Sequence, residues 1–167
     1  QDIGEKHDLE TLANTDGLTG LFNERYFTMM LQSKEKKKLP FVLVYLDLDY
    51  FKPINDTYGH TMGDKLLQET AKRLLQCIRK NDYVFRIGGD EFTILFSMDF
   101  DEHMASEIRT RLKTMLEKPF EIDGHTLRVG CSMGLAAYPK ESGDAACIRI
   151  LADRRMYEEK EKNHKGR

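Results

Sequence analysis

A short glycine-rich turn between two strand-like segments constrains the fold of this chain more than any other feature. The segments on either side, 83–87 and 92–96, are rich in aromatic and β-branched residues, which favours β-strands. Gly88, Gly89, Asp90 and Glu91 separate them, and a connection of that length predicts a β-hairpin. Adjacent carboxylates at such a tip are unfavourable unless a cation or strong donors compensate them. Taken alone, the tip also fits an ordinary solvated turn.

The composition describes one globular domain. Of the 167 residues, 40% are hydrophobic and 32% charged, so the chain can bury a core under a well-hydrated surface. A net charge of −2 lacks the basic excess typical of nucleic-acid-binding proteins. The longest apolar run, Phe41 to Leu46, is too short to cross a bilayer. The cysteines form no CxxC pair, so we expect small core residues in a reducing cytoplasm at Cys77, Cys131 and Cys147.

The order of the hydrophobic patterns predicts an α+β fold. The continuous apolar run at 41–46 predicts a strand buried on both faces. Helices with one apolar face are predicted at 24–38 (with Asn23 as N-cap), 64–78, 104–116 and 145–156, and further strands at 120–122 and 127–137. Because strands and helices intermix without strict βαβ alternation, we expect a mostly antiparallel sheet with helices packed on it.

A second acidic cluster lies where the buried strand ends. Asp47 and Asp49 share one face by the two-residue period of a strand. Acids are ordinary at the solvent end of a strand, where they often cap the next helix. A strand-end carboxylate beside a hairpin-tip carboxylate, however, forms an oxygen-rich site that suits Mg²⁺. Lys52 is either an ordinary surface cation or the positive clamp that phosphoryl and nucleotidyl transfer require.

Two further polar pairs each have a structural and a functional interpretation. Asn55 and Asp64 flank two glycines, and an amide with a carboxylate can recognise a guanine edge. Each of these residues alone fits a helix cap better. Arg79 and Asp82 are three residues apart, and this spacing by itself indicates a helix-end ion pair.

Together these residues resemble the GGDEF-domain diguanylate cyclases, which make cyclic di-GMP from two GTP. The similarity runs in the same order from Asp16 to about Lys160, through segments 16–23, 47–56, 59–64, 88–92, 132–136 and 152–157. The family's fold is a five-stranded, mostly antiparallel central sheet with surrounding helices and a β-hairpin. It is related to the nucleotidyl cyclase catalytic domain, with its ferredoxin-like core. The resemblance therefore implies a GGDEF domain over residues 16–167, preceded by a helical linker over 1–15.

The resemblance also implies how the acidic residues act. Asp47 and Asp90 are similar to the metal-binding carboxylates of the family, with the Leu48 carbonyl as a further ligand for Mg²⁺ or Mn²⁺. Glu91 resembles the acid that either assists deprotonation of the attacking 3′-hydroxyl or binds a second metal ion. Sequence alone leaves both roles of Glu91 open.

Substrate and product contacts follow from the same resemblance. The implied substrate-binding residues are Lys52 and Lys160 for the phosphates, Asn55 and Asp64 for guanine, and Gly88 and Gly89, whose turn approaches the phosphates and ribose. Arg79 and Asp82 match the family's RxxD product-inhibition site, since an arginine fork suits the guanine and phosphate of cyclic di-GMP. One departure is His164, which stands where the family has a phosphate-contacting arginine.

The implied reaction needs a homodimer, because each domain carries half of the site. GTP is the expected substrate and cyclic di-GMP the product and inhibitor, with no nucleic-acid partner. We expect a cytoplasmic location, with membrane contact only through other domains of a larger sensor. The alternatives are a catalytically silent module that binds GTP or cyclic di-GMP, and a cyclase that makes a one-nucleotide ring. The intact tip favours synthesis, and the implied guanine and product-site residues disfavour the one-nucleotide ring.

Overall fold

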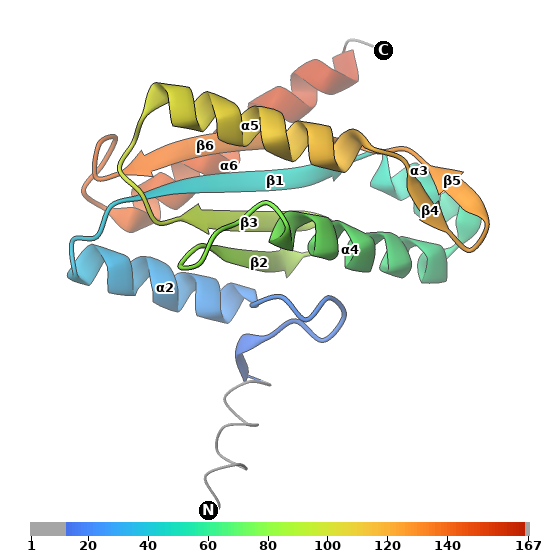
Figure 1. The fold of residues 1–167 in the computed structure, drawn as a ribbon, viewed down its shortest axis with the longest axis horizontal. Coiled ribbons are helices and arrows are strands. Elements are labelled where there is room, and N and C mark those ends of the chain that lie inside the picture. The colour runs from blue at the N-terminus through green and yellow to red at the C-terminus, as the bar shows by residue number, and fades with distance from the viewer. Residues whose placement is uncertain (1–12, 166–167) are drawn as a thin grey trace, which may run out of the picture.

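The computed structural model describes residues 13–165, and these residues form helices on both faces of an antiparallel sheet (Figure 1). The sheet has four strands in the order β2-β3-β1-β6, and each neighbouring pair is antiparallel. Its strands are β1 (Phe41–Asp49), β2 (Tyr83–Gly88), β3 (Glu91–Phe96) and β6 (Gly130–Tyr138). A separate two-stranded ladder consists of β4 (Phe120–Ile122) and β5 (His125–Leu127). The expected α+β fold is confirmed, with four strands in the main sheet and a short ladder beside it.

The labelled helices are α2 (Glu24–Lys36), α3 (Phe51–Tyr58), α4 (His60–Leu75), α5 (Glu102–Glu117) and α6 (Ala145–Lys165). Short α3 packs against α4, and the other four cover the two faces of the sheet in pairs. The apolar residues of α4 and α5 pack on one face of β1, and those of α2 and α6 pack on the other. Between residues 13 and 165, no helix has both the length and the apolar character needed to cross a bilayer.

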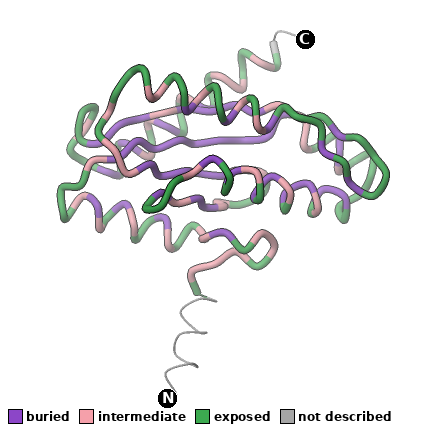
Figure 2. Tube along the Cα trace, in the orientation of Figure 1, coloured by how far each residue is buried: buried purple, intermediate pink, exposed green. Residues whose placement is uncertain are grey.

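β1 is the centre of the fold, as its apolar run predicts. Every residue from Phe41 to Asp49 is buried, which agrees with the purple centre of the sheet in Figure 2. Alternate residues belong to the two separate apolar clusters, so β1 joins both layers of the core. The strand therefore ends in buried acids, and this burial determines the chemistry of the site described below.

The helix boundaries follow the local sequence signals. Asn23 is the N-cap of α2, as predicted, and its side chain accepts a hydrogen bond from the Tyr26 N–H at 3.0 Å. Gly59 separates α3 from α4 with a φ of 90°, a conformation that glycine adopts without strain. α4 begins at His60, one turn before the predicted start at Asp64.

Two predictions from the sequence are wrong in detail. The strand expected over 127–137 begins at Gly130 as β6, and Leu127 belongs to the separate strand β5, because β5 pairs with β4 whereas β6 pairs with β1. Cys147 is exposed and is not a core residue, unlike the buried Cys77 and Cys131. It lies on α6 between Ala145 and Ile148, which face the core. The helical period therefore turns residue 147 toward solvent. The predicted linker over 1–15 falls largely on residues outside 13–165.

Side chains satisfy the outer edge of β6, the last strand of the sheet. The Met133 and Ala137 N–H groups donate to Glu159 and Glu141 at 3.0 Å each, and Arg155 donates to the Leu135 carbonyl at 2.6 Å. These bonds occupy backbone groups that could otherwise pair with another chain. They also fix α6 along the edge of the sheet.

Gly134 allows α6 to approach β6 closely, and its replacement tests this packing. A methyl group at residue 134 would overlap the backbone of Ala152 and Met156. We expect Gly134→Ala to lower the free energy of unfolding by about 3 kcal/mol. Denaturant titration measures the change, and the control Gly143→Ala, where a methyl group meets open space, should change it by less than about 0.5 kcal/mol. Equal effects of the two substitutions would contradict the close packing of α6 on β6.

Candidate functional site

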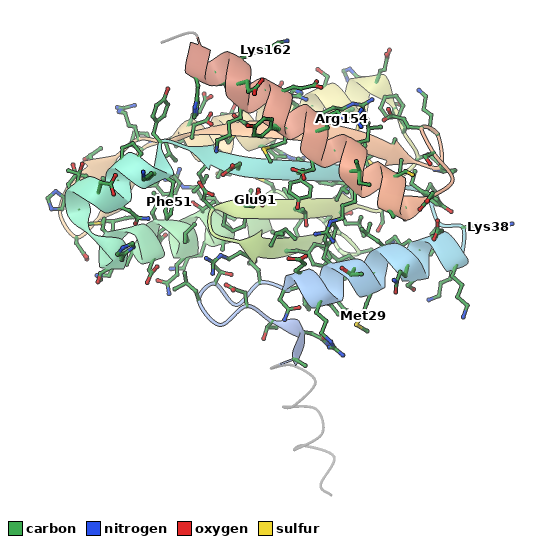
Figure 3. The ribbon with its side chains drawn as sticks, turned by 180° about the vertical axis from the view of Figure 1, so that it is seen from behind. Met29, Lys38, Phe51, Glu91, Arg154 and Lys162 are labelled. Atoms are coloured by element: carbon green, nitrogen blue, oxygen red, sulfur yellow. The ribbon has the colours of Figure 1, made fainter. Side chains whose placement is uncertain are left out.

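The two acidic segments of the sequence meet at one end of the sheet. The register between β1 and β3 sets Asp47 directly opposite Glu91. The Leu48 N–H donates to the Asp90 carbonyl at 3.3 Å, so the hairpin tip lies along the end of β1. Figure 3 marks Glu91 at this end of the sheet, at the start of β3. The strand-end acid and the tip acids are therefore neighbours, as the sequence predicts.

An arginine that the sequence analysis did not single out holds the hairpin tip in place. The Arg86 guanidinium donates to the Gly89 carbonyl at 3.1 and 2.9 Å and to the Asp16 carboxylate at 3.1 and 3.2 Å. Gly89 has a φ of 52°, in the left-handed region that favours glycine. Asp16 also accepts hydrogen bonds from the Thr19 N–H and hydroxyl. The first turn of the described chain thus braces the tip.

Asp47 is the most perturbed acid of the site. Burial raises its pKa to about 7, and the neighbouring Asp90 carboxyl adds to the rise, whereas Lys160 opposes it. Lys160 lies with its Nζ 2.6 Å from Asp47 Oδ2. Asp47 Oδ1 is buried and accepts no hydrogen bond from residues 13–165. Burial also raises the pKa of Glu91, with further contributions from the negative charges of Asp47 and Asp153.

These acids fit a magnesium site of the kind that substrate completes. Within residues 13–165, no three His, Cys, Asp or Glu side chains converge into a metal cage. Mg²⁺ does not require one, since one or two carboxylates, water and substrate phosphates usually complete its shell. Asp47 Oδ1, which has no hydrogen-bond partner among residues 13–165, and the negative charges of Asp90 and Glu91 close to the Asp47 carboxyl supply hard oxygen donors and excess negative charge. The donor set therefore matches the chemistry that Mg²⁺ prefers.

Asn55 and Asp64 lie on the two helices joined at Gly59, and neither caps a helix. The N-cap residues are Tyr50 for α3 and Gly59 for α4, and among the described residues neither N-cap position carries a side-chain cap bond. The capping interpretation of the two residues is therefore wrong. A methyl group at Gly63 would overlap the Asn55 amide, so this glycine admits the Asn55 side chain between the helices. Asn55 Oδ1 is buried there and has no hydrogen-bond partner within residues 13–165, and Asp64 is exposed.

Arg79 and Asp82 have different environments. Asp82 is buried and accepts hydrogen bonds from the Arg79 N–H at 2.9 Å and the Ser97 N–H at 3.0 Å, so it fixes the turn before β2. The Arg79 Nε lies 3.7 Å from Asp82, but 63% of the arginine side chain is exposed. The ion pair expected from the spacing is present. It still leaves the Arg79 guanidinium accessible to a ligand.

Comparison with known proteins identifies the family. Residues 13–166 match the family described as "Diguanylate cyclase, GGDEF domain". The chain belongs to the GGDEF-domain family. A crystal structure of a sensory box/GGDEF family protein from Caulobacter crescentus superimposes on the GGDEF domain with a TM-score of 0.80 and 35% identity. That match covers 89% of this chain and 99% of the other.

Longer curated proteins also contain a similar GGDEF domain. Escherichia coli cyclic di-GMP phosphodiesterase PdeR is 39% identical over 160 residues, which are 92% of this chain and 23% of PdeR. Treponema denticola diguanylate cyclase A is 35% identical over 158 residues, which are 90% of this chain and 42% of that protein. The chain thus spans less than half of the length of these two relatives.

The last turns of α6 bring further side chains to the site of this GGDEF domain. The Asn163 Nδ2 donates to Asp49 at 3.2 Å and to the Ser132 hydroxyl at 3.0 Å, and Ser132 donates to the same buried carboxylate. His164 stacks on the Tyr50 ring, and its Nε2 lies 3.8 Å from Asp49. From the sequence, His164 stands out as a departure from the family, whereas no local signal marks Asn163 or Ser132. Only the folded chain brings these residues, more than 80 positions from Asp49, into contact with it.

The raised pKa of Asp47 implies a specific pH dependence of the stability of the metal-free domain. Because folding raises this pKa from its ordinary 3.8 to about 7, protonated Asp47 stabilises the fold below pH 4, and the contribution is lost as the pH rises past 7. We therefore compare the melting temperatures of wild type and Asp47→Asn in EDTA. We expect the wild-type value, relative to that of the variant, to decrease as the pH is raised from 5 to 8. Asp99→Asn, at an exposed acid, is the control. A constant difference between wild type and Asp47→Asn would contradict the assignment.

Proposed function

We propose that this GGDEF domain is a diguanylate cyclase, which condenses two GTP into cyclic di-GMP and two pyrophosphates. The observation that carries the proposal is the pairing of Asp47 with Glu91 at the hairpin tip, where one buried oxygen of Asp47 lacks a hydrogen-bond partner among the described residues. The name of the Treponema relative, diguanylate cyclase A, supports the same activity. Since this chain covers only part of that relative, the activity is a proposal for this domain.

In the proposed complex, GTP lies across the end of the sheet. Asn55 and Asp64 recognise guanine, and the carboxylate of Asp64 favours GTP over ATP because adenine leaves it unpaired. Lys52, exposed in the first turn of α3, and Lys160 contact the phosphates. The glycine turn at 88–89 allows the backbone to approach the ribose and phosphates.

The chemistry is two identical substitutions between facing domains. Each 3′-oxygen attacks the α-phosphorus of the other GTP, a new phosphodiester bond forms, and the bond to pyrophosphate breaks. Bound Mg²⁺ would supply charge stabilisation to the triphosphate. Glu91 accepts the 3′-hydroxyl proton, a role that its raised pKa suits because the base operates near neutral pH. Each domain holds one nucleotide, so synthesis requires a homodimer, and dimerisation supplies the proximity of the two reactants.

The competing function is a regulatory module that binds GTP or cyclic di-GMP without synthesis. The relative PdeR, named as a cyclic di-GMP phosphodiesterase, contains a GGDEF segment of comparable identity, so this family segment also occurs in proteins named for another activity. Intact Gly88, Gly89, Asp90 and Glu91 favour the enzyme, because the acids and the close-approach turn that synthesis needs are all present. Product analysis separates the two functions.

The decisive variant is Glu91→Gln, which keeps the shape of the side chain and removes its basicity. The chain is fused to an N-terminal dimerising coiled coil and incubated with GTP and Mg²⁺, and products are separated by chromatography with mass detection. We expect cyclic di-GMP from the wild type and at least a 100-fold lower rate from Glu91→Gln, as for loss of a general base. GTP affinity should change by less than about threefold. No product from the wild-type dimer, with GTP bound, would support the regulatory module.

Arg79 should control inhibition by the product. Because its guanidinium is exposed and Asp82 is committed to the turn, we expect Arg79→Ala to raise the inhibitory concentration of cyclic di-GMP at least about tenfold without unfolding the domain. Lys80→Ala removes an equal charge from the next exposed residue and is the matched control. The inhibition is measured from the initial rates of synthesis at increasing concentrations of added cyclic di-GMP. Unchanged inhibition in Arg79→Ala would assign this arginine to the structural ion pair alone.

A further inference from the structure

Lys160 and Asp47 form an ion pair at the proposed metal site. Lys160 projects from α6, and its Nζ lies 2.6 Å from Asp47 Oδ2. The Asp47 side chain is 9% exposed and that of Lys160 is 24% exposed, so water screens the pair only partly. In the described chain, this ammonium is the cation bonded to the buried carboxylate that is expected to bind metal.

The ammonium and a divalent cation cannot both neutralise this carboxylate without repelling each other. Both would lie within a few ångströms of the Asp47 oxygens, where the dielectric screening is weaker than in bulk water. Asp47 Oδ2 is already bonded to Lys160, whereas Oδ1 has no hydrogen-bond partner in the part of the chain that the structure describes. A metal ion that approaches Oδ1 therefore meets a carboxylate whose charge is partly compensated. Its binding is weakened for as long as Lys160 stays in place.

Helix α6 is fixed on both sides of Lys160, so the side chain can move without the helix. Glu159, the preceding residue, accepts bonds from Arg109 and Lys113 of α5 and from the Met133 N–H of β6. Asn163, one turn later, is bonded to Asp49 and Ser132. These contacts hold the backbone, and the four-carbon stem of lysine lets the ammonium reach a second partner from the same anchor.

We propose that Lys160 is an internal counter-cation, which neutralises Asp47 in the metal-free domain and leaves it when the divalent cation binds. The triphosphate of GTP is the second partner of the displaced ammonium, and this half of the inference rests on the proposed function. Metal and nucleotide then each increase the affinity of the domain for the other. The metal frees the ammonium of Lys160 for the triphosphate, and the triphosphate holds that ammonium away from Asp47. The exchange also keeps a buried carboxylate paired in the absence of substrate.

Metal binding without nucleotide tests the displacement directly. The intact chain is titrated with Mn²⁺ at pH 8, and free Mn²⁺ is measured by electron paramagnetic resonance for wild type, Lys160→Gln and Lys162→Gln. We expect Lys160→Gln to bind Mn²⁺ at least about fivefold more tightly than wild type. Lys162→Gln removes the same charge from an exposed position of α6, and its affinity should stay within about twofold. Equal affinities of wild type and Lys160→Gln would overturn the inference.

Amine labelling of the wild type provides a test that needs no substitution. An acetylating reagent is applied with and without Mn²⁺, and the modification of Lys160 and Lys162 is compared by mass spectrometry. We expect metal to accelerate labelling of Lys160 at least about threefold and to leave Lys162 unchanged, since displacement frees the amine from its carboxylate. Protection of Lys160 by the metal, or no change, would overturn the displacement.

These measurements separate the inference from the proposed function. Displacement by Mn²⁺ in a protein that makes no cyclic di-GMP would support the counter-cation and contradict the cyclase. Synthesis of cyclic di-GMP, together with equal Mn²⁺ affinities of wild type and Lys160→Gln, would support the cyclase and overturn the counter-cation. A wild type and Lys160→Gln variant that both fail to bind Mn²⁺ would overturn the counter-cation, and the product assay would then decide the cyclase independently.

Discussion

The antiparallel pairing of β1 with β3 is the interaction on which the rest of the site depends. It joins β1, which is buried over its whole length, to the strand that leaves the glycine turn. Side chains on paired strands alternate in step, so a shift of one residue would turn Glu91 to the opposite face from Asp47. The apolar residues of β1 prevent that shift, because it would also move Leu43 and Val44 out of their separate clusters. Core packing therefore determines the register of the acids.

The same pairing creates an electrostatic cost within the fold. Asp47, Asp90 and Glu91 lie together where burial weakens the solvation of charge, so the pKa values of Asp47 and Glu91 are raised. A domain selected only for stability would place neutral side chains here. Local conflict between stability and chemistry is expected at functional sites, where the surrounding structure holds the unfavourable groups in place. Here Arg86 holds the hairpin tip and the core holds β1.

The architecture could be predicted from the sequence where one physical signal dominates. The apolar run of β1, the Asn23 cap and the glycine turn each specify their element locally, and each is confirmed. The separation of β5 from β6 could not be predicted, because it depends on which partner strand each half meets. The apolar neighbours of Cys147 in the sequence predict a core position, whereas the helical period that places Ala145 and Ile148 in the core turns residue 147 toward solvent.

The candidate site could be predicted in part, for a similar reason. The acids suit metal chemistry by residue type, and the fold places Asp47 and Glu91 opposite each other. The guanine contacts of Asn55 and Asp64 stay predictions. The residues that were missed position other groups of the site. Arg86 and Asp16 hold the hairpin tip, and Ser132 and Asn163 are hydrogen-bonded to each other and to Asp49. Nothing in their local sequence indicates a partner. Their contacts span 70 residues between Asp16 and Arg86 and 31 between Ser132 and Asn163, and only the folded chain forms them.

Helix α6 links the acid site to the opposite layer of the domain. Glu159 ties it to α5 across the outer edge of β6, and Arg149 ties it to Glu24 at the start of α2. Lys160 lies between the first of these attachments and the Asn163 bonds, on a helix that is held at both ends of its last two turns. The fixed helix and the flexible side chain of Lys160 together allow its ammonium to pair first with Asp47 and then with the triphosphate. An arginine at residue 160 would bind a carboxylate in a more rigid, two-pronged geometry, and would exchange less readily.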